Sequence, residues 1–417
     1  MSRGEDFLSI QTAPLSRPKL GTGFGPHLSV PPWKGEKLYF KGDDYFRDLL
    51  KSIEKSRISL DFESYIFEPG HLGDRVLLAL SRAVRRGVRV RLLVDGVGSP
   101  DFASHYGPRL EKARIPFKVY RSWPVFFSTA FRLFRFKRLG LSFRNIHSLF
   151  NGGKHRDHRK LCVVDGTQVW IGSFNVSDWH MEKIKGREAW RDTGMGLSGV
   201  TTYVFRLAFL IAWEDTWPNR RRRKYRSLMK RWVARESMRN PIRLTVTRRL
   251  RVLFRKELLA RFQSAETRIW VLTPYFVPSR SIVKSLASAA QRGCDVRLIL
   301  PGRSDVPIVR WVSMTFYPAL LRAGCRLFEY QRSVLHGKTF FVDSWVMVGS
   351  SNLDQRSLRK DLEINVEPQE KKSIQTLERQ YKRDLLECRE ITPGDMAHRP
   401  LGARVLSWFF YRYRSWF

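Results

Sequence analysis

The sequence predicts an α/β protein made of two similar halves, each a mixed β-sheet flanked by helices, related by a pseudo-twofold axis. Three observations support this fold class. Short apolar segments typical of strands alternate with amphipathic helical segments, the alternation occurs twice along the chain, and the same polar triplet recurs at corresponding places in both copies. Because a duplicated fold puts equivalent residues on equivalent elements, we expect the two triplets to meet at the interface between the halves.

The first recurring element is an amphipathic helix that ends at a glycine. Residues 82–95 read RAVRRGVRVRLLVD and residues 288–301 read SAAQRGCDVRLILP, so Gly87 corresponds to Gly293. Before each glycine, apolar residues follow the spacing of one helical stripe. These residues are Val76, Leu77, Leu80, Ala83 and Val84 in the first copy and Ile282, Val283, Leu286, Ala289 and Ala290 in the second.

Each of these helices lies between two predicted strands. The segments ISLDFESYIF (58–67) and RIWVLTPYFV (268–277) precede the helices, and VRLL (90–93) and VRLI (296–299) follow them. Strands that alternate with helices in this way indicate an α/β sheet in each half.

A basic run, NRRRRKYRSLMKRW (219–232), marks the break between the halves. The first half also contains an extra segment, residues 122–150, that the second half lacks. We therefore divide the chain into an N-terminal arm (1–36), a first half (37–240), a second half (241–392) and a C-terminal tail (393–417).

The charge balance is strongly basic, which favours a polyanionic partner. The 417 residues include 76 Lys and Arg against 39 Asp and Glu, for a formal net charge of +37. Such a charge attracts nucleic acid or an anionic membrane, and composition alone does not separate the two. A hydrophobic content of 43% with 28% charged residues excludes a disordered chain and a multispanning membrane protein.

The cysteines and the N-terminal sequence suggest a reducing, cytoplasmic setting. Cys162, Cys294, Cys325 and Cys388 show no CxxC or other metal-ligand spacing. The N-terminus has no apolar run of the signal-peptide kind, and no uncharged run approaches the ~20 residues that a membrane-spanning helix needs.

The polar triplet has the form His-x-Lys-x₄-Asp and occurs as HRKLCVVD (158–165) and HGKTFFVD (336–343). Chance would give well below about 0.1 copies in a chain of this length. On a strand, the His and the Lys share one face while the Asp faces the other, so the Asp is expected to anchor the strand. The candidate catalytic set is His158, Lys160, Asp165, His336, Lys338 and Asp343.

A second pair of motifs follows each triplet. Ser173 and Asn175 in GSFN, with Ser350 and Asn352 in GSSN, are candidate phosphate-binding residues because their side chains carry hydrogen-bond donors. Further along lie two carboxylates that are expected to fix the tautomer of the histidines. They are Asp192, in WRDTG, and Glu363, in DLEINV.

Together these residues predict phosphoryl-group transfer. Two lysines, two serines and two asparagines would form a positive cup for one tetrahedral phosphate, while two histidines supply a nucleophile and an acid. This set suits a covalent phosphohistidine intermediate. The sequence contains no HExxH motif, Asp-rich metal cluster or Walker loop, so neither a metal nor a cofactor is expected.

The paired motifs resemble those of the phospholipase D superfamily, and the resemblance extends from residue 37 to residue 367. Within that superfamily the chain is most similar to the bacterial cardiolipin synthases of the type without N-terminal transmembrane helices. The similarity rests on YIFEPGHLG (65–73), RGVRVRLLVDGVGS (86–99), WRDTG (190–194), the stretches SDVPIVR and LFEYQRSVLHGK, and GSSNLDQRS (349–357).

The resemblance implies two phospholipase D-like halves with the active site at their interface, and a phosphatidyltransferase that makes cardiolipin from phosphatidylglycerol. It also implies that His158 is the nucleophile and His336 the general acid and base, although the pseudo-symmetry leaves these roles interchangeable. One departure is Asp361, in KDLEINV, where the family more often has Asn.

Two segments favour a membrane partner. SWPVFFSTAFRLFRFKRLGLSF (122–143) and RVLSWFFYRYRSWF (404–417) interleave aromatic and basic residues, which suits a membrane interface. Each basic residue near an anionic leaflet contributes about 1 kcal/mol. We expect the protein to lie peripherally on the cytoplasmic face of the bacterial inner membrane, with phosphatidylglycerol or phosphatidylethanolamine as the partner lipid. The alternative is that these aromatics belong to the core beneath a basic surface.

Other functions remain open on the residues alone. Aromatic side chains between arginines can stack bases, so a nuclease or another phosphodiesterase acting on nucleic acid is one alternative, which the length of the resemblance disfavours. A phospholipase D-type hydrolase is another. A third is a non-catalytic membrane scaffold, which would have no need of two histidines.

Overall fold

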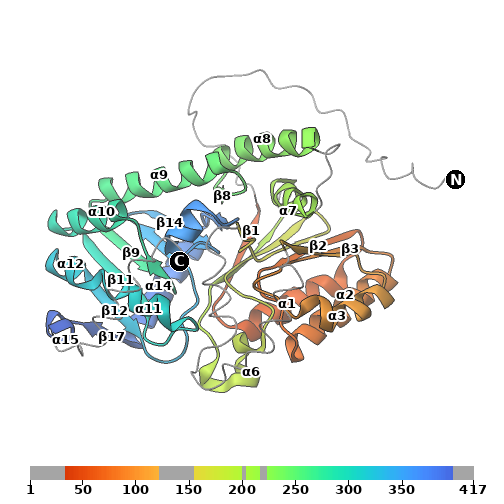
Figure 1. Ribbon diagram of the computed structural model, residues 1–417, viewed down its shortest axis with the longest axis horizontal. Coiled ribbons are helices and arrows are strands. Elements are labelled where there is room, and N and C mark those ends of the chain that lie inside the picture. The colour runs from red at the N-terminus through yellow and green to blue at the C-terminus, as the bar shows by residue number, and fades with distance from the viewer. Residues whose placement is uncertain (1–32, 122–154, 200–202, 217–222, 398–417) are drawn as a thin grey trace, which may run out of the picture.

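The computed structural model describes residues 33–121, 155–199, 203–216 and 223–397. These residues form two mixed β-sheets that lie side by side, each with helices against it, which confirms the predicted α/β fold of two halves (Figure 1). The first half runs in colour from red through yellow to light green, and the second from green to blue.

The first sheet has seven strands in the order β1-β7-β6-β5-β2-β3-β4. Strands β2, β3 and β4 are parallel to one another, and the other neighbours pair antiparallel. The strands are β1 (Gly35–Tyr39), β2 (Ser59–Ser64), β3 (Arg89–Asp95), β4 (Phe117–Tyr120), β5 (Leu161–Val164), β6 (Gln168–Gly172) and β7 (Gly194–Ser198).

Helices cover both faces of the first sheet. Helices α1 (Gly42–Lys55), α2 (His71–Arg85) and α3 (Phe102–Lys112) share one apolar core with it, and α7 (Tyr203–Asp215) shares another. The apolar stripe predicted for α2 packs into the first of these cores, with Val84 only partly buried. Gly87 follows the helix at φ 83°, a conformation that favours glycine.

The second sheet has eight strands in the order β17-β12-β11-β9-β13-β14-β16-β8. Its centre repeats the first sheet, because parallel β9 and β11 stand beside an antiparallel β13. The strands are β8 (Ile242–Leu244), β9 (Arg268–Leu272), β11 (Asp295–Pro301), β12 (Arg326–Tyr330), β13 (Thr339–Val342), β14 (Trp345–Gly349), β16 (Ile364–Val366) and β17 (Cys388–Ile391), with β10 (Phe276–Val277) and β15 (Leu353–Asp354) forming a separate pair.

The helices of the second half also lie on both faces of their sheet. One apolar core contains residues of α9 (Arg248–Ser264), α10 (Arg280–Gln291), α11 (Pro307–Ser313), α12 (Tyr317–Arg322) and α13 (Gln355–Arg359). The core on the opposite face contains residues of α14 (Lys371–Leu386). The last element of the described residues is the short helix α15 (Pro393–Ala397).

The two halves are joined by reciprocal backbone contacts. The N–H of His158 donates to the carbonyl of Leu362 at 3.0 Å, and the N–H of His336 donates to the carbonyl of Arg191 at 2.8 Å. Leu362 and Arg191 directly precede Glu363 and Asp192, the two candidate orienting carboxylates. Each motif histidine is therefore held next to the carboxylate of the other half, which is the pseudo-twofold relation expected from the repeat.

The predicted domain boundaries can be compared with the order of the elements. The chain leaves the first sheet after β7 and, after α7 and α8 (Arg223–Arg239), enters the second sheet at β8, close to the predicted break at residue 240. Strand β1 begins at Gly35 and Trp33 is buried, so the described residues of the predicted arm already belong to the folded first half.

The extra segment 122–150 and most of the tail lie outside the described residues. Within the described part of the chain, none of the helices combines the length and apolarity needed to cross a membrane. The four cysteines are free thiols, and three of them are buried.

Candidate active site

The two histidines and two lysines lie in the short extended segments just before β5 and β13. His158 is 7% exposed and His336 is 3% exposed, and both lysines are buried as well. The regular strands begin only at Leu161 and Thr339, so the predicted alternation of faces along a single strand does not extend over the whole triplet.

The aspartates of the triplets lie at the opposite ends of these strands. Asp165 and Asp343 follow β5 and β13 in the left-handed conformation, at φ 50° and 51°. Four strand residues separate each Asp from its lysine, a span of ~16 Å. The two aspartates therefore lie outside the group that could contact a substrate, although they were included in the candidate catalytic set.

Both aspartates bind the backbone of a neighbouring turn. Asp165 accepts the N–H of Ile58 at 2.7 Å and that of Ser59 at 2.9 Å, just before β2 and at its first residue. Asp343 accepts the N–H of Thr267 at 2.8 Å, just before β9. These bonds tie β5 to β2 and β13 to β9, which is the anchoring role expected from the sequence.

The two orienting carboxylates act across the interface between the halves. Glu363, from the second half, lies 3.1 Å from Nδ1 of His158, and Asp192, from the first half, lies 2.6 Å from Nδ1 of His336. Because Nδ1 of each imidazole is bonded to a carboxylate, Nε2 is the ring nitrogen left for chemistry.

The lysines lie in a dry and positive environment. Each Nζ donates to the carbonyl of its own motif histidine at 2.6 Å. Burial, together with the charge of Lys338, lowers the pKa of Lys160 to about 7, and burial lowers that of Lys338 to about 8. A bound phosphate would relieve this mutual repulsion, so the pair is well suited to hold an anion.

The histidines are neutral in this environment. Burial, together with the charge of Lys338, lowers the pKa of His336 to about 3, and burial with the charge of Lys160 places the pKa of His158 well below its ordinary value. A neutral imidazole has a lone pair on one nitrogen, so each ring can act as a nucleophile or a base.

The two carboxylates differ in basicity. Burial raises the pKa of Glu363 to about 7. Burial also acts to raise the pKa of Asp192, but His180 and His336 hold it well below its ordinary value. His336 therefore faces the more firmly ionised carboxylate, which breaks the symmetry of the site.

The two serines of the GSFN and GSSN motifs already have protein partners. The hydroxyl of Ser173 bonds to the carbonyl of Thr193 at 3.1 Å, and the hydroxyl of Ser350 donates to Glu363. A hydroxyl has only one proton to donate, so in this arrangement the protons of both serines are used within the protein.

The asparagines of the same motifs are better placed to bind phosphate. Asn175 and Asn352 are buried, and Nδ2 of Asn175 has no hydrogen-bond partner among the described residues, nor does Oδ1 of Asn352. Because the two ends of an amide are interchangeable by rotation, each side chain can present N–H groups to an anion.

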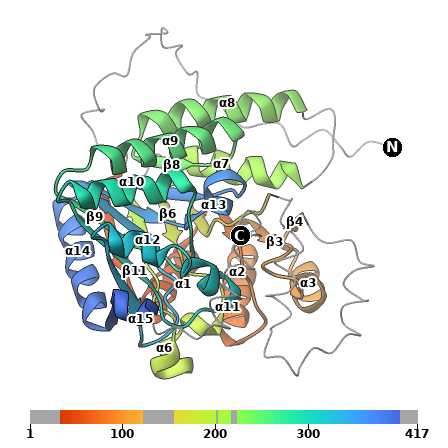
Figure 2. The same cartoon turned by 60° about the vertical axis from the view of Figure 1, so that its left-hand side comes forward.

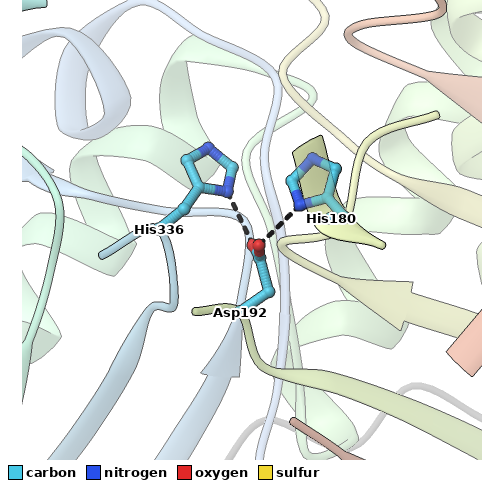
Figure 3. Close-up of side chains that lie close together, drawn as sticks. All are labelled: His180, Asp192 and His336. Atoms are coloured by element: carbon cyan, nitrogen blue, oxygen red, sulfur yellow. Dashed lines mark hydrogen bonds and ion pairs between the residues drawn. The ribbon is translucent and has the colours of Figure 1, made fainter. Parts of the chain in front are cut away.

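His180 is a buried site residue that the sequence reasoning missed. Its Nδ1 lies 2.6 Å from Oδ2 of Asp192, so this carboxylate binds two histidines (Figure 3). Its Nε2 accepts the N–H of Asn175 at 3.3 Å, and in the second half Ser357 accepts the N–H of Asn352 at 3.2 Å. Aligning GSFNVSDWH with GSSNLDQRS would have identified the pair.

His180, Asp192 and His336 together offer three potential metal ligands. Their possible ligand atoms lie within 4.8 Å of one another. A tetrahedral ion would hold ligand atoms about 3.3 Å apart, whereas each Asp192 oxygen is 2.6 Å from a histidine nitrogen, a hydrogen-bond distance. The arrangement fits two N–H···O bonds better than a bound ion.

Aromatic rings cover the two histidines. The ring of Tyr65 lies 4.7 Å from that of His158, with Nζ of Lys160 4.9 Å from the tyrosine ring. In the other half, the ring of Trp190 lies 5.3 Å from that of His336. These rings limit the access of water, and motif spacing alone did not reveal them.

Asp361, the residue that departs from the family pattern, has two partners near the site. It accepts the backbone N–H of Arg156 at 3.1 Å and pairs with Nε of Arg356 at 2.9 Å. The carboxylate thereby links the segment before His158 to the helix that follows the GSSN motif.

Comparison with known proteins identifies the family of the chain. The family described as "Cardiolipin synthase, PLD-like domain" matches residues 49–185 and 258–385. The chain belongs to this family. It is therefore a phospholipase D superfamily enzyme, as the paired motifs suggested.

Relatives and solved structures extend over most of the chain. A cardiolipin synthase of Clostridium perfringens (strain SM101 / Type A) is 27% identical over 376 residues, covering 88% of this chain and 74% of the relative. A cardiolipin synthase of Geobacillus kaustophilus (strain HTA426) is 29% identical over 410 residues, covering 95% and 75%.

Among solved structures, the phosphatidylserine synthase of Haemophilus influenzae Rd KW20 has a TM-score of 0.63 at 11% sequence identity. The match covers 91% of this chain and 94% of that one. The polyphosphate kinase of Porphyromonas gingivalis has a TM-score of 0.54, also at 11% identity, over 91% of this chain and 56% of that one. These likenesses show a shared fold.

Proposed function

We propose that the protein is a cardiolipin synthase-type phosphatidyltransferase. It transfers a phosphatidyl group from one phosphatidylglycerol to a second, giving cardiolipin and glycerol. The observation that carries this proposal is the pair of neutral imidazoles from opposite halves, each held by a carboxylate of the other half beside a buried lysine. No metal is needed, because the lysines and asparagines supply the charge and the hydrogen bonds that a phosphate requires.

In the first step Nε2 of His158 attacks the phosphorus, and the bond from phosphorus to the oxygen of the glycerol headgroup breaks. Nε2–H of His336 gives its proton to that oxygen, so glycerol leaves as a neutral alcohol. The negative phosphate between Lys160 and Lys338 offsets the positive charge that lowers the pKa of His336, and this allows His336 to carry the proton.

In the second step, a hydroxyl of another phosphatidylglycerol attacks the phosphorus of the adduct. Neutral His336 takes the proton of that hydroxyl while the bond from phosphorus to His158 breaks. Cardiolipin leaves, and both histidines return to their starting protonation states. Exclusion of water by the surrounding rings favours transfer over hydrolysis.

The unequal carboxylates support the assignment of roles. Asp192 bonds His336 at 2.6 Å and is firmly ionised, so it stabilises the imidazolium that a general acid must form. Glu363 lies farther from His158, at 3.1 Å, and has a pKa raised to about 7 by burial. His158 therefore suits the role of the nucleophile, which reacts in its neutral form.

The test is a lipid analysis by mass spectrometry after purified protein is incubated with phosphatidylglycerol vesicles. Cardiolipin and glycerol should appear in equal amounts, and the His336→Asn variant should produce no cardiolipin. Phosphatidic acid as the sole product would make the protein a hydrolase. Cleavage of single-stranded DNA faster than any lipid turnover would overturn the lipid assignment.

We also propose that the enzyme acts as a peripheral protein on the cytoplasmic face of the bacterial inner membrane, with phosphatidylglycerol or phosphatidylethanolamine as partner lipids. The net charge of +37 supports an anionic surface as partner. The aromatic and basic segments 122–143 and 404–417, on which the sequence argument depends, lie outside the described residues.

A further inference from the structure

Helix α8 has a buried apolar face and an exposed one. Met229 and Val233 are buried in the core that includes α7. One helical turn apart on another face, Leu228 is 48% exposed and Trp232 is 44% exposed. In both views α8 lies at the outer edge of the molecule (Figures 1 and 2).

The charges of α8 surround this exposed face. Its sequence, RKYRSLMKRWVARESMR, contains one acid, Glu236, which accepts the hydroxyl of Tyr203 at 2.7 Å. Arg226 pairs with Asp215. By contrast, Lys230, Arg231 and Arg235 have no ion pair among the described residues, so their charges are available to a partner.

We propose that α8 lies in the headgroup region of an anionic phospholipid bilayer, with Leu228 and Trp232 inserted and the neighbouring basic residues bound to lipid phosphates. The sequence predicts only a boundary between the halves at the basic run 219–232, most of which lies in α8. The exposed apolar residues give this helix a second role. The choice of lipid as partner rests on the proposed function.

The exposed apolar pair favours a bilayer over a nucleic acid. A basic helix with Trp and Leu on one face gains free energy when those side chains enter the boundary between headgroups and acyl chains. Tryptophan prefers this zone because its ring is apolar and its N–H is polar. Phosphates of nucleic acid would attract the arginines equally well but would leave Leu228 exposed to water.

The position of α8 along the chain brings the bilayer close to the catalytic machinery. Strand β8 follows the helix directly, and Thr245 follows β8. The hydroxyl of Thr245 donates to the carbonyl of Asp361 at 2.8 Å and accepts the N–H of Glu363 at 2.6 Å. The segment that leaves the docked helix therefore holds the carboxylate that orients His158.

Two double variants with the same change of charge test the proposal. In Leu228→Glu/Trp232→Glu, both exposed apolar side chains of α8 become acidic. In Ile184→Glu/Leu386→Glu, the same change is made at two exposed apolar side chains elsewhere, 40% and 86% exposed. Thermal unfolding of each variant shows whether the fold is kept.

Binding is measured by co-sedimentation of the full-length protein with vesicles of phosphatidylglycerol and phosphatidylcholine, without any turnover. The α8 double variant should bind about tenfold more weakly, a loss of about 1.4 kcal/mol by the tenfold conversion, whereas the control variant should change less than about twofold. Hydrogen exchange of the unmodified protein should also slow in residues 223–239 when these vesicles are added, and should not change with pure phosphatidylcholine.

Equal losses in the two double variants, or no loss in either, would refute the docking role of α8. So would a tenfold loss of single-stranded DNA binding by the α8 variant with its vesicle binding intact, which would make the helix a nucleic-acid site. Vesicle binding needs no catalysis, so the two proposals can fail separately. Failure to make cardiolipin would refute the proposed function, whereas the binding data alone decide the role of α8.

Discussion

Asp192 belongs to the first half, yet its Oδ1 lies 2.6 Å from Nδ1 of His336 in the second half. Glu363 of the second half has the same relation to His158 of the first. Each half thus lacks the carboxylate that orients its own histidine. It follows that neither half can form a competent site alone, and that the interface between the halves is part of the catalytic machinery.

The two carboxylates should differ in importance. Asp192→Asn should lower kcat by about 10³-fold or more, because an amide can neither fix the correct tautomer nor stabilise an imidazolium. The fall in kcat for Glu363→Gln should be about 10- to 100-fold smaller than the fall for Asp192→Asn. Burial raises the pKa of Glu363 to about 7, so this carboxyl is already partly neutral at pH 7. Turnover of phosphatidylglycerol in mixed micelles measures both, and equal losses would contradict the assigned asymmetry.

The phosphohistidine intermediate can be trapped by removing the acid and base. In His336→Asn, a donor whose leaving group needs no proton, such as a p-nitrophenyl ester of phosphatidic acid, should leave a phosphatidyl adduct on His158, because the incoming alcohol has no base to activate it. Mass spectrometry of the denatured, digested protein should find the adduct on the peptide that contains His158. His158→Asn is the matched control and should give no adduct, whereas an adduct on His336 would exchange the two roles.

Duplication is the reason that so much of this fold was predictable. A repeated stripe such as Val76, Leu77 and Leu80 fixes the helix and the strand after it, and a second copy makes chance improbable. The recurrence of His158 and Lys160 as His336 and Lys338 identified the site for the same reason. These features depend on residues that are near one another along the chain.

The features that the sequence does not predict depend on how the two halves dock and on local backbone geometry. Nothing in the spacing shows that Glu363 orients His158, because 205 positions separate them. The alternation argument did not hold for Asp165, which lies past the end of β5 at φ 50°, although its anchoring role was expected. His180 was missed because the second half has Ser357 in its place, so the shared pattern hid it.

Anion binding should weaken as the lysines lose their protons. The pKa values of Lys160 and Lys338 are lowered to about 7 and about 8. Raising the pH from 6 to 9 therefore removes the positive charge of both lysines in the ligand-free enzyme. The inhibition constant of inorganic phosphate should rise over this range. Lys338→Met should weaken inhibition about 10- to 100-fold at pH 6, and a constant independent of pH would contradict the role of the lysines.

Asp343 should contribute to stability in a defined pH range. Burial opposes ionisation, but hydrogen bonds from Thr267 and the neighbouring backbone lower the pKa of Asp343 from 3.8 to about 2. A group with a depressed pKa in the folded state stabilises the protein above its unfolded pKa, and this contribution is lost as the pH falls from about 4 to about 2. Because solvent screens this partly exposed group, Asp343→Ala should lower the free energy of unfolding by about 1 kcal/mol at pH 7.

Denaturant unfolding at pH 7 and at the lowest pH where the fold persists measures this difference, which should shrink with acidification. Asp165→Ala, at the equivalent position of the first half, serves as the companion variant and should also destabilise. If Asp343→Ala lowered turnover without changing stability, the residue would belong to the catalytic group after all.

His180 should act as a positioning residue for Asp192. His180 and His336 together oppose the effect of burial and hold the pKa of Asp192 below its ordinary value, so removing one of them should raise that pKa. His180→Ser introduces the residue that the second half carries at Ser357. We expect kcat to fall about tenfold and the acid limb of the pH profile to move to higher pH, because the carboxylate then takes up a proton earlier as the pH falls. His105→Ser, on an exposed face of α3, is the control. A fall in kcat with an unmoved acid limb would mean that His180 only packs the interior.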